Sequence, residues 1–228
     1  MGETLGPLIE RLPAFLGGHL QLSVAAILTA LAVSLPLGIA AARNPKIAAP
    51  ALTVASVMQT IPALALLALM VPLLGGTIGF APAFIALTLY GVLPVLRNTI
   101  VGLQGVDRTV REAARGIGMS PAQSLAQVEL PLAAPTIIAG VRTATAWVVG
   151  AATLATPVGA TSLGNYIFSG LQTRSWDMVI FGCVCSAGLA ILLDQLIRAL
   201  HVSAEARKPL QAVLAGCAVV LIPAAAMS

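Results

Sequence analysis

Long stretches of this sequence run without a charged residue for at least the thickness of a bilayer. Leu20 to Ala42 gives 23 successive uncharged positions, and Ile47 to Leu96 gives fifty. A helix needs about 20 apolar residues to cross the hydrocarbon core. Backbone N–H and C=O groups inside a membrane must form their hydrogen bonds within a helix or within a closed barrel of strands. For such long apolar runs this favours helices. The sequence therefore predicts an all-α integral membrane protein, and its charged content of only 9% supports this.

The apolar runs and their breaks predict one transmembrane domain covering residues 1–228, with a core of about 19–200. Residues 1–18 are interpreted as a short interfacial segment. Gly75-Gly76-Thr77 is the expected turn between the second and third spans. The stretch 160–177 is expected to form an outer loop or a short helix. About six spans are predicted, near residues 20–42, 50–72, 80–100, 134–159, 178–200 and, as an additional C-terminal span, 210–227.

The short loops differ in their content of Lys and Arg, and this difference predicts the orientation. Positive residues accumulate in the cytoplasmic loops of membrane proteins. We therefore expect both termini outside and the charged central loop inside. The basic residues of the richer side are Arg43, Lys46, Arg108, Arg111, Arg115, Arg207 and Lys208, with Arg97 and Arg198 nearby, whereas only Arg11 and Arg174 fall on the other side.

The central loop, residues 106–131, holds five of the twenty charged residues within nine positions. Its apolar residues recur with helical spacing, which predicts a short amphipathic helix. Asp107 is a suitable N-cap, and Gly116 and Gly118 can take the positive φ at which a helix ends. Ser120 and Pro121 then predict a second helix start with a capping box. The apolar face comprises Val106, Val110, Ala113, Ala114 and Ile117.

The residues Glu112-Ala113-Ala114, Gly118 and Leu130-Pro131 resemble the EAA loop of binding-protein-dependent ABC importer permeases. In that family the loop is a coupling helix seated in a groove of a separate ATPase subunit. The resemblance implies a type I ABC importer permease fold with the coupling loop inside the cell. The alternative from the residues alone is a basic interfacial helix lying on anionic lipid. The coupling residues implied are Arg111, Glu112, Ala113, Ala114, Arg115, Gly118 and Ser120.

Two further stretches, Gln59 to Leu66 and Leu89 to Thr99, are similar to the osmoprotectant branch of these permeases, which handles glycine betaine, proline betaine, choline and carnitine. Shorter matches are Leu20-Gln-Leu-Ser23, Pro36-Leu-Gly38 and Leu163-Gly164. The branch usually has a glycine-rich run before this last Leu-Gly, where Pro157, Thr161 and Ser162 stand here. The resemblance implies an importer of such small osmolytes. A permease for another small solute, or an ion-gradient-driven secondary transporter, is the alternative.

The same resemblance implies the partners. It predicts a multi-pass subunit of the bacterial cytoplasmic (inner) membrane, in contact with lipid and paired with a second permease copy or a homologue. Two ATPase subunits would carry ATP and Mg, and an extracytoplasmic binding protein would deliver the solute. No GxxxxGK[ST] occurs in the sequence, so we expect no ATPase site, no cofactor and no enzymatic activity in this chain. The scattered basic residues do not suggest nucleic-acid binding.

Polar and aromatic residues within the spans are candidates for the transport pathway, because a polar side chain at membrane depth faces protein or water. Gln59 could equally hydrogen-bond a neighbouring helix. Arg142 is the cation deepest in a span, and its side chain could reach the interface or pair with Asp194 at similar depth. The pathway and outer-gate candidates are Gln59, Pro62, Tyr90, Trp147, Leu163, Gly164, Asn165 and Tyr166.

Overall fold

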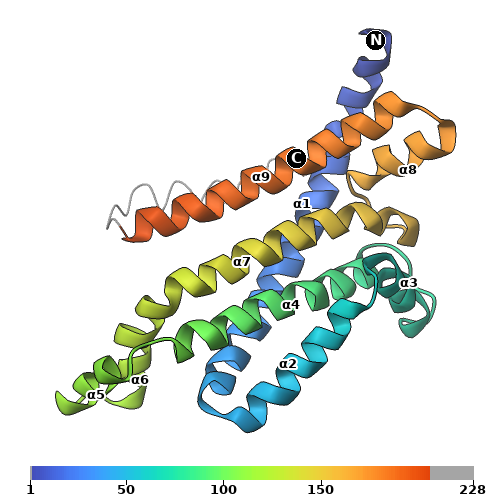
Figure 1. The fold of residues 1–228 in the computed structure, drawn as a ribbon. Helices are drawn as coiled ribbons and strands as arrows, with labels where there is room; N and C mark the ends of the chain where they lie inside the picture. Colours follow the sequence, from blue (N-terminus) through green and yellow to red (C-terminus); the bar gives the residue numbers. More distant parts are fainter. Residues whose placement is uncertain (1, 206–228) are drawn as a thin grey trace.

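The computed structural model describes residues 2–205, and in that range the regular structure is helical (Figure 1). Four helical stretches are long and apolar enough to cross a membrane, and a bent pair gives a fifth candidate. The sixth expected span, 210–227, lies outside the described residues. The long helices are α1 (Gly2–Arg43), α4 (Phe80–Gln104), α7 (Leu130–Ala152) and α9 (Trp176–Glu205), and the bent pair is α2 (Pro45–Thr60) with α3 (Ala63–Leu73).

The interpretation of residues 1–18 as a separate interfacial segment is wrong, because α1 begins at Gly2 and continues through the described part of this segment as one 42-residue helix. Packing explains this continuation in spite of Pro7 and Pro13. The Tyr166 ring lies edge-on to Phe15, with centroids 4.9 Å apart, and its hydroxyl donates to the carbonyl oxygen of Leu8 at 2.6 Å. The first turns of α1 therefore rest against Tyr166.

The second expected span is broken. Helices α2 and α3 meet at Ile61 and Pro62 with a bend of 102°. Proline has no N–H to continue the ladder, and it pushes the residue before it toward extended backbone, as seen in the φ of −72° and ψ of 126° of Ile61. The Tyr90 hydroxyl donates to the Ile61 carbonyl oxygen at 2.6 Å, and Gln59 Nε2 donates to the Tyr90 carbonyl oxygen at 3.0 Å. Tyr90 of α4 thus supplies a hydrogen-bond donor for the backbone carbonyl at the break.

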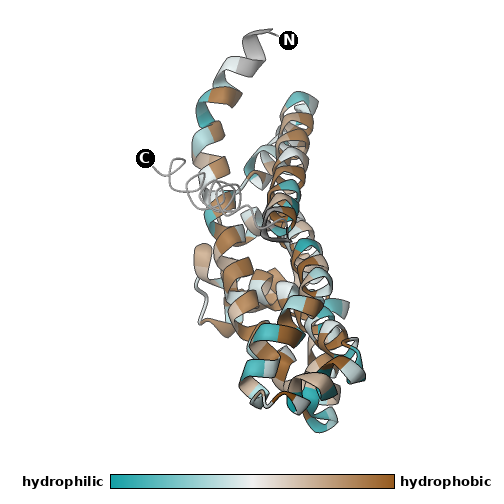
Figure 2. Cartoon of the chain, turned by 90° about the vertical axis from the view of Figure 1, so that its left-hand side faces the viewer, coloured by the Kyte–Doolittle hydropathy of each residue, from teal (hydrophilic) through white to brown (hydrophobic). Residues whose placement is uncertain are grey.

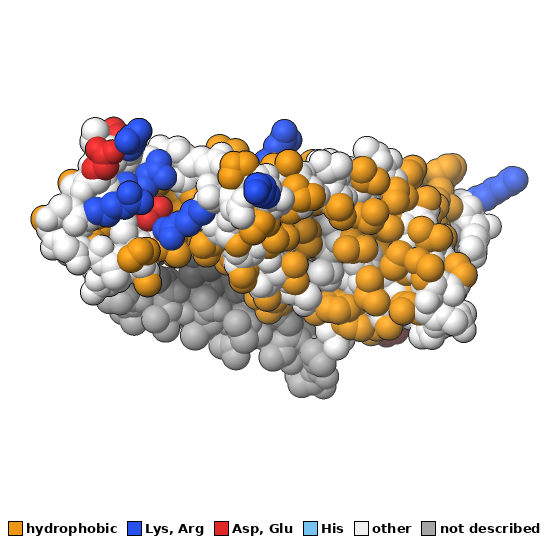
Figure 3. All heavy atoms as spheres, turned by 90° about the horizontal axis from the view of Figure 1, so that it is seen from below, with side chains coloured by type: hydrophobic (Ala, Val, Ile, Leu, Met, Phe, Trp, Pro, Cys, Tyr) orange, Lys and Arg blue, Asp and Glu red, His pale blue; other side chains and the backbone are white. Residues whose placement is uncertain are grey.

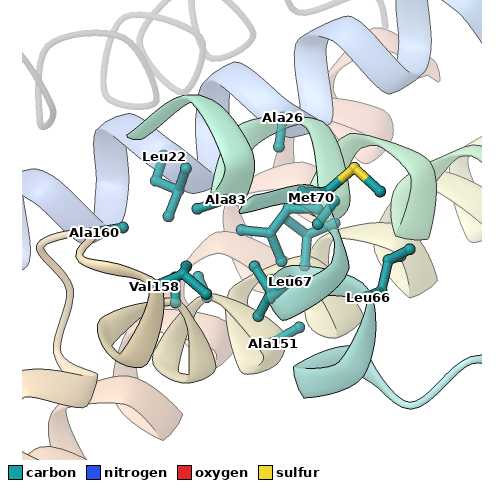
Figure 4. Packing of buried hydrophobic residues seen from close by; sticks show 14 of the residues in the cluster. Leu22, Ala26, Leu66, Leu67, Met70, Ala83, Ala151, Val158 and Ala160 are labelled. Atoms are coloured by element: carbon teal, nitrogen blue, oxygen red, sulfur yellow. The ribbon is translucent and has the colours of Figure 1, made fainter. Parts of the chain in front are cut away.

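The core forms where α1, α3, α4 and α7 meet. Figure 4 shows its apolar side chains, among them Leu22, Leu67 and Met70, packed against one another. Helices α4 and α7 approach closely at Gly140, where an added Cβ would lie 2.7 Å from the carbonyl oxygen of Pro94. Small residues at crossings let membrane helices pack by direct backbone approach. Hydrophobic residues cover the long helices, and hydrophilic residues gather toward the lower end (Figure 2).

The expected turns are present at both ends of the helices. Gly75 and Gly76 take φ of +66° and +86° between α3 and α4, as the Gly-Gly pair predicts. At the same end, helix α8 (Gly164–Thr173) occupies the expected outer stretch, after a 3-10 segment (Thr153–Val158). At the opposite end lie α5 (Arg108–Gly116) and α6 (Pro121–Ser124). A π-helical segment, Leu125–Glu129, then leads into α7.

Candidate coupling loop and transport pathway

Helix α5 starts as its sequence predicts. The side chain of Asp107 accepts from the backbone N–H of Thr109 at 2.8 Å and from the Thr109 hydroxyl at 2.8 Å. These two bonds lower the pKa of the Asp107 carboxyl below its ordinary value, since they stabilise the charged form. One turn on, Arg108 Nε lies 2.7 Å from Glu112 Oε1 in an exposed i, i+4 ion pair. The helix is therefore well defined by local contacts.

The end of α5 is a tight turn at Gly118, whose φ is +86°. The N–H of Met119 donates to Ala114 O at 3.1 Å and the N–H of Gly118 to Arg115 O at 3.0 Å, a Schellman motif. Gly116 remains helical, so only one of the two candidate glycines takes positive φ. The loop thus reverses direction within three residues.

Helix α6 follows with the predicted capping box. Ser120 Oγ accepts from the N–H of Gln123 at 3.3 Å, and Gln123 Oε1 accepts from the N–H of Ser120 at 2.9 Å. Pro121 occupies the first helical turn, where its missing N–H costs nothing. Two capped helices with a glycine turn between them make a rigid unit.

The apolar face of α5 is mostly uncovered. Ala114 and Val106 are buried, whereas Ile117 is 76% exposed and Val110 is 37% exposed. Ala113 is also exposed. Charged side chains surround this end of the molecule in Figure 3. An apolar strip on a charged, water-facing helix is typical of a docking surface for another protein.

A buried carboxylate that sequence reasoning missed joins the coupling loop to the spans. Glu129, 6% exposed, lies at the end of the π-helical segment. Its Oε1 accepts from Arg43 Nη2 at 2.9 Å and from Ser124 Oγ at 3.1 Å. The only signal in the sequence is the opposite charges of Glu129 and Arg43 at the ends of two apolar runs. The contact links the end of α1 directly to the start of α7.

The pathway candidates form two separate groups. Gln59, Pro62 and Tyr90 come together at the break between α2 and α3, and there Gln59 makes the helix-to-helix bond that was its alternative interpretation. Trp147 is on α7 and is 47% exposed.

The second group lies at the turn into α8, at the end of the molecule opposite α5. Leu163, Gly164 and Tyr166 are buried within this chain, and Asn165 Oδ1 accepts from the N–H of Ser162 at 2.8 Å. These residues shape the turn into α8, and Leu163 and Tyr166 pack in a cluster with residues of α1, α7 and α9.

Arg142 and Asp194 are paired between α7 and α9. Arg142 Nε and Nη2 donate to Asp194 Oδ1 and Oδ2 at 2.7 and 2.8 Å, a bidentate contact. Each charge neutralises the other in an apolar part of the chain, so the Arg142 side chain reaches a protein partner instead of the interface. The pair fixes the last described helix against α7.

His19, which the sequence did not mark, is completely buried in α1. Its Nδ1 accepts from the N–H of Leu163 at 3.3 Å, so Nε2 carries the proton and donates to Val149 O at 3.1 Å. One imidazole therefore joins α1, α7 and the turn before α8. No sequence motif surrounds it. Among residues 2–205, no group of three or more His, Cys, Asp and Glu side chains is placed to hold a metal.

The fold and the coupling loop define a membrane transport subunit, and comparison with known proteins identifies its family. Residues 34–203 match the family model described as "Binding-protein-dependent transport system inner membrane component". This match covers more than half of the chain, and the chain belongs to this family of membrane permeases.

Its relatives share sequence along most of their length. The choline transport system permease protein OpuBB of Bacillus subtilis (strain 168) is 44% identical over 179 residues, 78% of this chain and 82% of the relative. The glycine betaine/carnitine/choline permease OpuCB of the same organism is 42% identical, covering 79% and 82%. The osmoprotectant import permease OsmW of Salmonella typhimurium (strain LT2) is 40% identical, covering 81% and 87%.

A solved structure shares the fold. The inward-facing MetNI methionine ABC transporter matches with a TM-score of 0.74 and 22% sequence identity, over 85% of this chain and 98% of that chain. This likeness confirms the predicted type I importer permease fold.

Proposed function

We propose that this chain is the transmembrane subunit of an ATP-driven importer for osmoprotectants of the quaternary ammonium class, such as choline, glycine betaine or carnitine. The observation that carries the proposal is the 40 to 44% identity to three permeases named for these solutes, each over more than three quarters of this chain. The coupling loop supports the ATP-driven part, because its exposed apolar strip offers a docking surface for a partner protein.

In this proposal the chain pairs with a second copy or a homologous permease, and two ATPase subunits bind the inner loops. ATP and Mg are held by the ATPases, since this sequence has no GxxxxGK[ST]. Both termini face outward, and an extracytoplasmic binding protein docks near α8. The chain itself is not an enzyme.

The coupling step uses the rigid contacts of the loop. The exposed strip of Val110, Ala113 and Ile117 seats in the ATPase, so that closure of the ATPase pair on ATP displaces α5 and α6 together. The contact of Glu129 with Arg43 passes this displacement to α1 as well as to α7. Movement of the spans then opens the pathway alternately to each side.

Solute choice is assigned to the binding protein. Recognition of a quaternary ammonium uses several aromatic faces, and only 4% of this chain is aromatic. The two tyrosines are engaged elsewhere, since Tyr90 holds the helix break and Tyr166 is buried under α1. Purified permease alone should show no selective solute binding in calorimetry. Selective micromolar affinity without the binding protein would place the selecting site in the membrane.

Reconstitution tests the function directly. The permease, its partner ATPase and the binding protein are placed in liposomes. Uptake of radiolabelled choline, glycine betaine and carnitine is then measured with ATP inside. Uptake should require ATP, the ATPase and the binding protein. An ATPase variant that lacks its phosphate-binding lysine is the matched control. Uptake by the permease alone under an ion gradient would show secondary transport and would refute the proposal.

A further inference from the structure

A basic pocket of about 500 Å³ lies between the inner end of α1 and the coupling loop. We call it the arginine pocket. Its walls come from two parts of the chain that are far apart in sequence, residues 42–43 and 111–129, and basic side chains gather over this end in Figure 3. The lining residues are Ala42, Arg43, Arg111, Arg115, Met119, Pro121, Ser124 and Glu129.

The charges in the arginine pocket do not balance. Three guanidinium groups face one carboxylate, which leaves two positive charges. Glu129 is buried and already accepts from Arg43 and Ser124. Within residues 2–205, neither Arg111 nor Arg115 lies within ion-pair distance of a carboxylate. Both are on one face of α5, four residues apart, so their charges are concentrated in one place. The nearest acids are Asp107, which acts on Arg111 electrostatically without an ion pair, and Glu112, which is paired with Arg108.

One donor in the pocket wall also lacks a partner. Arg111 Nη2 donates to the carbonyl oxygen of Val106 at 2.9 Å, which holds the guanidinium in place. Its Nε is shielded from solvent and has no acceptor among the described residues. A shielded donor without an acceptor is unfavourable, and an anion with several oxygens would satisfy it together with the free charges.

The position of the pocket indicates what kind of anion reaches it. Arg43 directly follows the uncharged run that ends at Ala42, and Glu129 directly precedes α7. Both residues therefore mark where the apolar spans meet water, which is the level of lipid headgroups. Basic pockets between helices on the cytoplasmic side are suited to anionic headgroups.

We propose that the arginine pocket binds the headgroup phosphate of an anionic phospholipid. The phosphate lies between Arg43 at the end of α1 and Arg111 and Arg115 on α5, and so bridges the first span to the coupling helix. The assignment of this lipid to the cytoplasmic leaflet rests on the membrane orientation in the proposed function. The binding of the phosphate by the arginines does not depend on that orientation. A bound lipid therefore holds α5 in position before an ATPase docks.

Native mass spectrometry of the full-length chain in a non-ionic detergent measures this binding. Phosphatidylglycerol, phosphatidylcholine and inorganic phosphate are titrated separately. The double variant Arg111→Gln/Arg115→Gln should bind phosphatidylglycerol about 30-fold more weakly than the wild type, since each basic residue near an anionic lipid contributes about 1 kcal/mol and 1.4 kcal/mol is tenfold. Phosphatidylcholine retention should be equal in both proteins.

Arg97→Gln is the matched control, because Arg97 is an exposed cation of α4 that does not line the arginine pocket and, unlike Arg108, is not paired with a carboxylate among residues 2–205. It should leave phosphatidylglycerol affinity within about twofold of the wild type. Arg111→Lys/Arg115→Lys keeps both charges and should retain most of the affinity. If the double glutamine variant aggregates, Arg115→Gln alone should weaken binding about fivefold.

Three results would overturn the proposal. The first is equal phosphatidylglycerol affinity in the wild type and the glutamine variants. The second is an equal loss in Arg97→Gln, which would indicate general surface charge. The third is binding of inorganic phosphate without preference for phosphatidylglycerol, which would replace the lipid by a free anion. None of these measurements depends on transport, so they leave the proposed importer function unaffected.

Discussion

The contact of α4 with α7 at Gly140 leads to a quantitative prediction. An added Cβ would lie 2.6 Å from Asn98 Cβ and 2.7 Å from the carbonyl oxygen of Pro94. Comfortable contact between such atoms is about 3.5 to 4.0 Å. The Asn98 amide donates to that same carbonyl oxygen at 2.8 Å, so the neighbours are held in place. Gly140→Ala must therefore push the two helices apart.

Overpacking of this kind costs about 1 to 3 kcal/mol of unfolding free energy. Replacing glycine by alanine within a helix raises the free energy of unfolding by roughly 0.5 to 1 kcal/mol, because the unfolded chain has less conformational entropy. Gly188→Ala is the matched control, because Gly188 is inside α9 and a Cβ there meets nothing within 4 Å. The two variants share the entropic gain, so their difference isolates the steric cost.

Thermal unfolding of the purified chain in detergent, followed by circular dichroism, measures this difference. A chain of this size shifts its melting temperature by about 2 to 4 °C per kcal/mol. Gly140→Ala should thus melt about 2 to 12 °C below Gly188→Ala. Equal melting temperatures would show that α4 and α7 do not approach each other closely at this crossing, and the packing argument would fail.

Three other predictions concern the loop, the ion pair and the outer end. Gly118→Val should abolish substrate-stimulated ATP hydrolysis while the permease still inserts into the membrane, because a β-branched residue resists a φ of +86°. Gly116→Val, at a helical glycine, should be tolerated. Equal activities of the two variants would contradict this prediction. Asp194→Asn and Arg142→Gln should each lower the melting temperature more than the double change, whereas simply additive effects would mean that the pair contributes no coupling. Tyr166→Phe should lower stability by about 0.5 to 1.5 kcal/mol in the same melts, as its hydrogen bond to α1 is lost; an unchanged melting temperature would show that this bond is not formed.

Local sequence determined the coupling loop almost completely. Asp107, Ser120 and the turn at Gly118 depend on partners one to five residues away, and such contacts are encoded in short spacings. The ambiguity between Gly116 and Gly118 shows the limit of this local information. Either glycine could take positive φ, and the hydrogen bonds of one Schellman motif selected the second.

The pairing of Arg142 with Asp194 could be predicted only in part from the sequence. The helix rise of 1.5 Å per residue makes depth in the membrane countable from the sequence, so two charges at similar depth can be matched. The sequence gives no rotation of α7 against α9, however, and a match in depth alone left the membrane interface as the favoured destination for the arginine. Packing of the two helices decided it.

The sequence by itself determined that the described chain is helical and where its apolar runs lie, because hydrocarbon forces the backbone to satisfy itself within each segment. Only the tertiary structure decided how the runs are divided. Residues 2–18 became part of α1, where Tyr166, far along the chain, contacts them, and at the break before Pro62 the Tyr90 hydroxyl satisfies the carbonyl oxygen of Ile61. Glu129 and His19 acquire their roles in the same way. Each depends on atoms between 86 and 144 positions distant, and no local pattern specifies which distant atoms will meet.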